Sequence, residues 1–290
     1  MTTAWIVTTT DQISSLVEIG RGLGGTLKAV VVGDAAVCGV DEVLRIALPA
    51  GVPAEAAAAA VADAVTAGAG DVVLVPNRGS ERVLAGAVAA RLGAPVLTGA
   101  TRVTPGAIEV ARFGGIATEI VSAAGPVVVL VTGGRTVEGE AAASSEVAAP
   151  KLLAAKVTAQ KANADATVDL GLAKRIVCVG RGFKAKEDLG MARDLASALG
   201  AEMACSRPLA EGVGWMSKES YVGVSGQSVK PDIYLALGIS GQLQHLAGAQ
   251  DAKVIVAVNS DEHAPIFAHA DYGIVGDLYQ VVPAMTLALK

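Results

Sequence analysis

Aromatic residues and cysteines are scarce in this chain. Phe, Trp and Tyr make up 3% of its 290 residues, so stacking platforms for bases or for a flat cofactor are few. The three cysteines, Cys38, Cys178 and Cys205, are scattered and show no CxxC spacing, which predicts small core residues. We therefore expect no structural metal or disulfide, and we expect any bound ring to be held by backbone, arginine, serine and amide groups.

Long apolar runs, a leader sequence and clustered basic charge are also missing. The apolar run at 126–131 is far shorter than the roughly 20 residues that cross a bilayer, and the first residues do not resemble a secretory signal. The net charge is −5, which argues against a nucleic-acid partner. Hydrophobic residues make up 52% of the chain. We expect a cytoplasmic protein of two domains with large cores and no membrane insertion.

Short β-rich runs alternate with helical segments in the first half of the chain. The runs 4–8, 28–32 and 71–75 predict strands, and 54–66 and 81–92 predict helices. This alternation is typical of an α/β domain in which helices flank a mainly parallel sheet.

A segment of small and polar residues begins at about 135 and interrupts this pattern. Its first part, up to 150, is expected to cross the surface, and the part from 151 is expected to add an extended edge strand. We predict an N-terminal α/β domain at 1–168 and a second, Rossmann-like α/β domain at 169–290.

The strand and helix alternation restarts at Arg175. A helix is predicted at 186–200, and strands are predicted at 175–180, 201–206, 233–237, 253–259 and 272–277. Glycine or polar turns follow these strands at Gly180, Ser206, Gly238, Asn259 and Asp277. Because ligands of open α/β sheets lie beyond the carboxyl ends of the strands, we expect the five turns to converge on one ligand.

The stretch from Ile233 to Asn259 predicts a nucleotide-binding turn. A strand ends at Gly238, the residues up to Gly241 form a glycine turn, and a helix is expected from Gln242 to Leu246. Ser240 would cap this helix, whose free N–H groups suit a pyrophosphate. The alternative is a capped helix with a polar pair, Gln244 and His245, on its solvent face.

Two arginines follow neighbouring strands. Arg181 lies in a Gly-Arg-Gly turn, where it would grip a phosphate or a protein carboxylate, or would be a plain surface residue. Ala185 stands where the third glycine of a dinucleotide fingerprint belongs, so the NAD motif is incomplete. Arg207 precedes a proline, which predicts an extended backbone and a side chain aimed at a flavin ring or at an interdomain ion pair. Ser206 beside it is a candidate ligand or a turn residue.

Other polar side chains complete the candidate set. Ser225 is bracketed by glycines and suits a hydrogen bond to a ring nitrogen, while Tyr221 would cover the ring or pack in the core. His245 is expected to donate to a ring carbonyl oxygen and to offset negative charge. His263 and His269 are expected at the surface or behind the residues that bind a ligand, and not as metal ligands. No nucleophile, base and orienting group occur together, so we expect no catalytic residues.

Several of these motifs together closely resemble the α subunit of electron transfer flavoprotein. They are the VGRG and SRP turns, YLALGISGQLQHLAG, VIVAVN and PIFAHADYGIVGD, and they extend from about Arg175 to the C-terminus. Residues 1–169 match more loosely. The SRP, WM, YVGVS and GISGQLQH segments look most like Fix-type (FixB-like) α subunits, which are associated with nitrogen fixation and anaerobic carnitine metabolism.

The resemblance implies one FAD in the second domain, a β subunit that completes a heterodimer, and an electron carrier that does not itself transform a substrate. By motif, Ser225 would approach the flavin N5, and Gln244 and His245 would face the pyrimidine side. The remaining implied roles are proximity to the cofactor for Arg181, Ser206 and Arg207, the pyrophosphate for Gly238, Ser240 and Gly241, and the ADP portion for Asn259 and Asp277.

One departure from the family concerns the flavin environment. Many members carry QVGQTG where this chain has YVGVSG, so Tyr221 and Val224 replace amides and flavin tuning is expected to differ. Electrons would come from a flavin dehydrogenase or a reduced donor, and would go to a quinone reductase or an acyl-CoA/carnitine pathway. The alternatives are an adenine-nucleotide-binding regulatory module and, less favoured because of Ala185, an NAD-dependent dehydrogenase.

Overall fold

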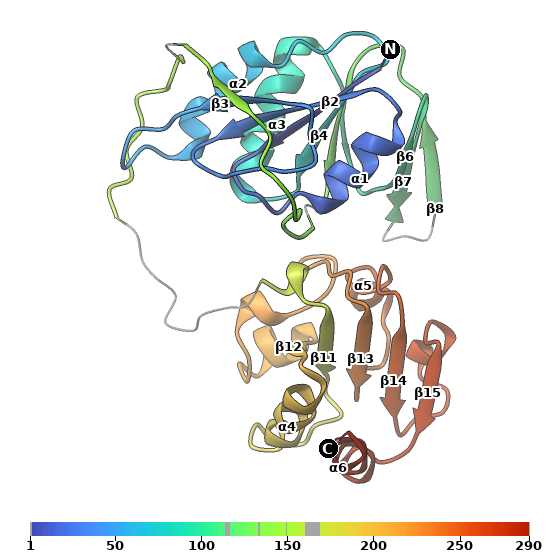
Figure 1. Ribbon diagram of the computed structural model, residues 1–290. Coiled ribbons are helices and arrows are strands. Elements are labelled where there is room, and N and C mark those ends of the chain that lie inside the picture. The colour runs from blue at the N-terminus through green and yellow to red at the C-terminus, as the bar shows by residue number, and fades with distance from the viewer. Residues whose placement is uncertain (1, 114–116, 133, 149, 160–168, 290) are drawn as a thin grey trace. The chain divides into compact units, whose positions relative to one another are not determined.

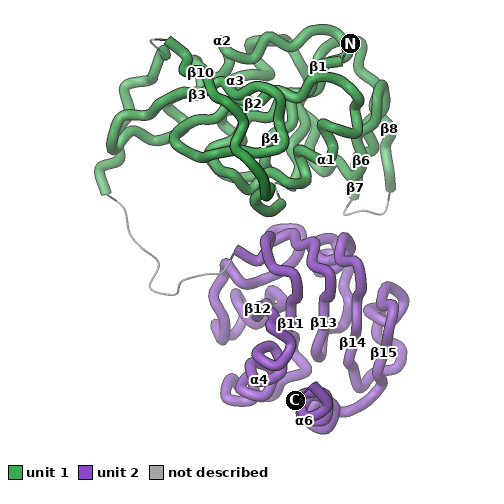
Figure 2. Tube along the Cα trace, in the orientation of Figure 1, with its two compact units in different colours: residues 1–161 green, residues 162–290 purple. Residues whose placement is uncertain are grey.

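The chain folds into two α/β units. The computed structural model describes residues 2–113, 117–132, 134–148, 150–159 and 169–289. The chain divides into two compact units, residues 1–161 and 162–290 (Figure 2). Each unit is built on a parallel sheet with helices, so the predicted fold class is confirmed (Figure 1).

The first unit has a seven-stranded sheet whose paired strands are all parallel. In spatial order its strands are β10 (Ser144–Glu146), β3 (Glu42–Ile46), β2 (Thr26–Val32), β1 (Thr3–Thr8), β4 (Val72–Pro76), β9 (Val127–Val131) and β5 (Val96–Thr98). The central strands β1, β4 and β9 are buried almost throughout. Strands buried on both faces read as continuous apolar runs, and this made them recognisable in the sequence.

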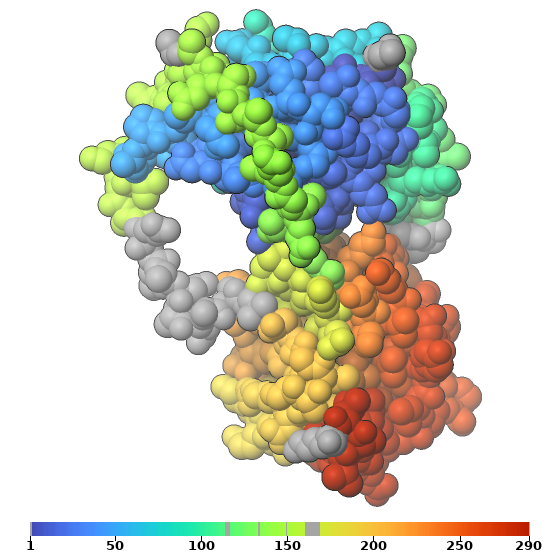
Figure 3. Space-filling model, viewed as in Figure 1, coloured from blue at the N-terminus to red at the C-terminus, as the bar shows by residue number. Residues whose placement is uncertain are grey.

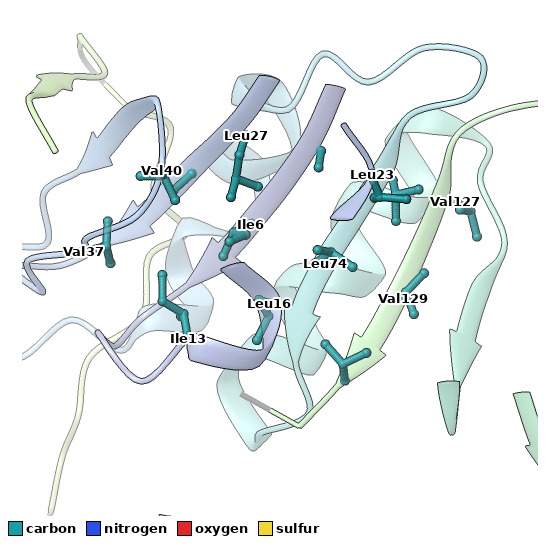
Figure 4. Close-up of a cluster of buried hydrophobic side chains, with 14 of the residues drawn as sticks. Ile6, Ile13, Leu16, Leu23, Leu27, Val37, Val40, Leu74, Val127 and Val129 are labelled. Atoms are coloured by element: carbon teal, nitrogen blue, oxygen red, sulfur yellow. The ribbon is translucent and has the colours of Figure 1, made fainter. Parts of the chain in front are cut away.

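Alternate residues of β1 enter two separate cores. Ile6 packs in one core with residues of α1 (Ser14–Gly22), as Figure 4 shows for part of the cluster. Trp5 and Val7 pack in the other core, against α3 (Gly79–Leu92) and the alanine-rich segment 54–64. This segment begins as the 3₁₀ turn Ala54–Ala57 and continues as α2 (Ala58–Ala64). The period-2 geometry of the strand thus places helices on both faces.

The edge strand predicted after residue 151 is not found in the described residues 150–159 and 169–174, and residues 160–168 of that segment lie outside the described residues. An edge strand, β10, lies earlier in the chain and pairs with β3. All three side chains of β10 are exposed, so its sequence has no apolar alternation and only backbone pairing defines it. The stretch that contains β10 crosses the outside of the first unit in yellow-green (Figure 3).

A small antiparallel sheet is absent from the sequence predictions. It consists of β6 (Ala100–Thr104), β7 (Ala107–Arg112) and β8 (Ala117–Val121). Gly106 has a φ of 81° in the turn between β6 and β7, where Thr104 pairs with Ala107. Ile108 and Val110 of β7 enter the first core, whereas four of the five residues of β8 are exposed.

The second unit has five parallel strands. Their order is β12 (Glu202–Cys205), β11 (Arg175–Val179), β13 (Ile233–Leu237), β14 (Ile255–Asn259) and β15 (Tyr272–Val275). Because the chain runs from β11 outward to β12 and then back across to β13, the strand order reverses between β11 and β13. This is the position at which doubly wound sheets bind ligands.

Two helices cover one face of this sheet. Buried residues of α4 (Leu189–Leu199) and α6 (Leu278–Ala288) pack in one core with β11 and β13. The other face is covered by Ile239, Leu246 and Ile266, which come from the connections around β13 and β14. The connections on this second face carry most of the candidate binding residues.

Tyr279 joins the start of α6 to the start of α4. Its hydroxyl donates to Asp188 Oδ2 at 2.6 Å and accepts from the Lys184 N–H at 2.8 Å. Tyr279→Phe should lower the free energy of unfolding of the second unit by about 1–2 kcal/mol, because it removes one charged and one neutral hydrogen bond. Urea unfolding measures this, with Tyr272→Phe on the 66% exposed Tyr272 as the control. Equal stability of both variants would contradict the assignment.

Candidate functional site

A cavity of about 640 Å³ lies at the reversal of strand order in the second unit. Its volume is typical of small-molecule sites. It is lined by residues that follow β11, β12 and β13 and by Asn259, the last residue of β14, so four of the five predicted turns meet there. Nine of the eleven predicted binding residues line it: Arg181, Ser206, Arg207, Ser225, Gly238, Ser240, Gln244, His245 and Asn259.

The other two predicted residues serve the fold in this structure. Asp277 is the N-cap of α6, where its Oδ1 accepts from the Tyr279 N–H at 3.0 Å. Gly241 has a φ of 85°, and a Cβ on it would lie 2.3 Å from the Ile266 nitrogen. Neither residue is among those that line the cavity. Their proposed contacts with a nucleotide stay predictions.

The turn after β13 differs from the predicted helix start. The helix α5 (Leu243–Leu246) has four residues, and its N-cap is Gln242 without a side-chain cap. Ser240 is therefore not the cap, and a helix dipole is no basis for a phosphate site here. The chain instead turns back along the sheet, since His245 of α5 reaches Tyr234, the second residue of β13.

Arg207 has a helical backbone and not the extended one that was predicted. Its φ and ψ are −46° and −42°, because it opens the single π-helical turn Pro208–Gly212. The tertiary turn overrides the usual preference of a residue before proline. Its Nε donates to Glu211 Oε2 at 2.5 Å, and this pairing raises the pKa of the exposed Arg207 guanidinium. Glu211 belongs to the same unit, so this is a local pair, four residues apart.

Tyr221 holds the loop that carries Ser225. The Tyr221 hydroxyl donates to the Ser225 carbonyl and lies 2.9 Å from Ser225 Oγ. The ring is 6% exposed and packs in the core of the second unit, and Tyr221 also lines the cavity, so both predicted placements stay open. Gly226 is required beside it, since a Cβ there would lie 2.3 Å from the ring. The replacement of an amide by Tyr221 thus fixes the serine loop.

His245 is a buried, neutral imidazole. It is 7% exposed, and burial lowers its pKa to about 4, with the Val222 backbone offsetting part of that shift. Its Nε2 lies 2.9 Å from the hydroxyl of the fully buried Tyr234. The predicted role as a hydrogen-bond donor fits this state, because a neutral imidazole keeps one N–H. A positive charge near pH 7 does not fit it.

The Asn259 side chain is held by hydrogen bonds within the fold, whereas the Arg181 side chain is exposed. The Asn259 amide donates to the Ile239 carbonyl at 2.9 Å and accepts from the Asp261 N–H at 3.0 Å, so it ties the ends of β13 and β14 together. Arg181 is exposed at the cavity wall. Beside it Gly182 approaches Gly238 so closely that a Cβ on Gly182 would lie 2.6 Å from the Gly238 Cα.

Two of the three cysteines lie in the core, as predicted, and the third does not. Cys178 and Cys205 are fully buried, but Cys38 is partly exposed, with its Sγ 3.3 Å from the Gly139 carbonyl. The described residues contain no group of three His, Cys, Asp or Glu that would suit a metal. His263 and His269 are exposed, as predicted. No helix in the described ranges has both the length and the apolarity to cross a membrane.

The groups around the cavity fit a flavin nucleotide. Two arginines, three serines, two glutamines and an asparagine line it, and none of the described lining residues is acidic. Such a lining suits an anionic ligand that also carries ring carbonyls and nitrogens. The Nδ1 atom of His245 is buried without a hydrogen-bond partner in the described structure, which leaves one polar atom unsatisfied at this site.

Comparison with known proteins assigns a family to both units. Residues 14–167 match the electron transfer flavoprotein domain, and residues 169–250 match the electron transfer flavoprotein FAD-binding domain. "Protein FixB" of Escherichia coli O7:K1 is 41% identical over 233 residues, which cover 77% of this chain and 74% of that protein. "Putative electron transfer flavoprotein subunit YdiR" of Escherichia coli K12 is 57% identical over 131 residues, 45% of this chain and 42% of that protein. The chain therefore belongs to the electron transfer flavoprotein α-subunit family, is FixB-like, and carries that family's FAD-binding domain in its second unit.

Proposed function

We propose that this chain is the FAD-binding α subunit of a heterodimeric electron transfer flavoprotein that acts in the cytoplasm as an electron carrier. The observation that supports this proposal most is the cavity at the β11/β13 switch point, which brings together nine of the predicted binding residues. A bound flavin supplies the redox chemistry, and the chain supplies position and electrostatics.

The lining divides into groups with different tasks. Arg181 and Arg207 bring positive charge, which favours phosphates and a ring that gains negative charge. The Ser225 hydroxyl is held by Tyr221 in a fixed loop. Gly238 lines the cavity, and both its φ of 63° and the close approach of Gly182 require glycine there. None of these residues acts as an acid, a base or a nucleophile.

The partners follow from the family. An α subunit of this family pairs with a β subunit, which we propose completes the flavin site. Electrons would arrive from a flavin dehydrogenase or another reduced donor. They would leave to a quinone reductase or to an acyl-CoA/carnitine-type reductive pathway.

The test is the nucleotide content of the full chain purified with its β subunit. We expect a yellow complex that releases one FAD per heterodimer on heating. Release of AMP or ADP without flavin would reject the electron carrier and would favour an adenine-nucleotide-binding regulatory module. Tight binding of NADH by direct titration would favour the dehydrogenase alternative.

Removal of the Arg207 charge should make the flavin harder to reduce. We expect Arg207→Ala to lower the midpoint potential by tens of millivolts, because a cation beside the ring favours its reduced, anionic form. Arg207→Lys keeps the charge and should keep most of the potential. Spectroelectrochemistry of the heterodimer measures both. An unchanged potential in Arg207→Ala would exclude the tuning role and leave Arg207 only its pair with Glu211.

A further inference from the structure

The buried imidazole of His245 is joined to a side chain that does not line the cavity. Tyr234 lies on β13 and is completely buried, and its hydroxyl is 2.9 Å from His245 Nε2. The two rings are tilted by 51°, with centroids 6.2 Å apart, so they meet through these polar atoms and not by stacking. On the neighbouring strand β11, Ile176 pairs with Tyr234, and Cys178 lies two residues further along. Cys178 also interacts with the Tyr234 hydroxyl.

The direction of the Tyr234–His245 bond follows from the groups on either side. Burial raises the pKa of Tyr234 well above its usual value, so the phenol keeps its proton. Its proton goes either to the imidazole nitrogen or to the Cys178 sulfur. An imidazole nitrogen is the stronger acceptor, and a thiol is a weak acceptor. The favourable order is therefore Cys178 S–H to Tyr234 and Tyr234 O–H to His245 Nε2.

The environment of Nδ1 supports the same order. Val222 is the backbone residue that interacts with the imidazole, and its effect is to raise the pKa of His245. Its N–H already donates to the Cys205 carbonyl at 3.0 Å, so the group that faces the ring is its carbonyl, which only accepts. The Nδ1 atom nevertheless makes no hydrogen bond of acceptable geometry to any residue that the structure describes.

We propose that Tyr234 fixes His245 in the neutral tautomer with the proton on Nδ1, on the side of the ring that faces Val222 at the wall of the ligand cavity. Val222 and His245 both line this cavity, and the Nδ1 atom itself is buried, so the tautomer sets the polarity of the ring at the cavity wall. Tyr234 is a positioning residue, because it sets which nitrogen donates without touching the ligand itself. The assignment of that ligand as a flavin rests on the proposed function, whereas the tautomer does not.

Nitrogen NMR of the full-length chain labelled with ¹⁵N-histidine tests this directly. The chain has only three histidines, and His263 and His269 are exposed, so the spectrum is simple. His245→Gln identifies the third signal. At pH 8 we expect His245 as the Nδ1–H tautomer, whereas a neutral imidazole in water prefers Nε2–H. A His245 signal with the Nε2–H pattern in the wild-type chain overturns the proposal, whatever the variants do.

Tyr234→Phe tests the cause. In this variant the Nε2–H form should become the major one, while Tyr272→Phe, which alters an exposed tyrosine, should leave the pattern unchanged. Circular dichroism establishes that the variants are folded, and if Tyr234→Phe is not, the wild-type spectrum still decides. A folded Tyr234→Phe chain that keeps Nδ1–H shows that another group holds the tautomer and overturns the role of Tyr234.

The FAD content of the heterodimer separates the two proposals. A chain with the Nδ1–H tautomer and no bound FAD would reject the electron carrier and retain the role of Tyr234. A chain with one FAD and the Nε2–H tautomer would support the electron carrier and reject the role of Tyr234.

Discussion

Replacing His245 by glutamine should flatten the pH dependence of stability between pH 6.5 and pH 4. Burial lowers the pKa of His245 from 6.5 to about 4, so the folded chain binds fewer protons than the unfolded chain in this range. Unfolding then takes up a proton, and the free energy of unfolding falls as the pH drops through the range. The full effect is roughly 3 kcal/mol in the wild-type chain and is absent from the variant.

The measurement has to report on the second unit alone. The chain has two tryptophans, Trp5 in the first unit and Trp215 in the second. Among the residues that the structure describes, the buried indole nitrogen of Trp5 has no hydrogen-bond partner, so Trp5→Phe loses no such bond and leaves Trp215 as the fluorescent reporter. Urea unfolding at a series of pH values then gives the stability of this unit in wild-type and variant chains.

A matched histidine provides the control. His263→Gln makes the same substitution at an exposed histidine and controls for the exchange itself. The lowered pKa of Asp41 concerns the first unit and affects stability only as the pH falls to 3.8 and below. Equal slopes for wild-type and His245→Gln chains would mean that His245 is protonated in the folded state, contrary to its burial.

Gly182→Ala should weaken FAD binding about tenfold or more and destabilise the second unit. A Cβ at this position would lie 2.6 Å from the Gly238 Cα and 2.9 Å from Leu278 Cδ2. The first of these is backbone, so the turns after β11 and β13 must move apart at the cavity. Overpacking of this kind costs about 1–3 kcal/mol, and 1.4 kcal/mol corresponds to a factor of ten in affinity.

Gly190→Ala is the matched control for this variant. Gly190 is the second residue of α4, and a Cβ there meets nothing within 4 Å. The substitution should leave FAD binding unchanged and raise stability by up to about 1 kcal/mol, because alanine favours the helix. Flavin fluorescence titration of the heterodimer and urea unfolding measure the two effects. Wild-type FAD affinity in Gly182→Ala would place the flavin away from this turn.

The sequence predicted the strands that are buried on both faces, and through them the site. Their apolar runs end at glycine or polar turns, and these turns mark the carboxyl edge of the second sheet in the sequence. The antiparallel sheet β6 to β8 was missed because its strands are partly exposed and have no strong apolar runs. The Pro105-Gly106 pair was a turn signal that would have indicated it.

Features that depend on tertiary structure could not be predicted from the sequence. The backbone of Arg207 follows the π-helical turn and not the local preference before a proline. The contact between Tyr234 and His245 exists only because the chain turns back after β13, so the apolar run of β13 marks Tyr234 as buried but not as a partner. Gly182 was recognised as part of a turn, but its approach to Gly238 comes from the pairing of β11 with β13.

A crystal structure of the FAD-loaded heterodimer tests the central claim most directly. We expect the isoalloxazine ring in the cavity, within about 3 Å hydrogen-bond distance of Ser225 and His245, and the pyrophosphate beside Gly238 and Ser240. A flavin bound only in the first unit or wholly within the β subunit would contradict the account.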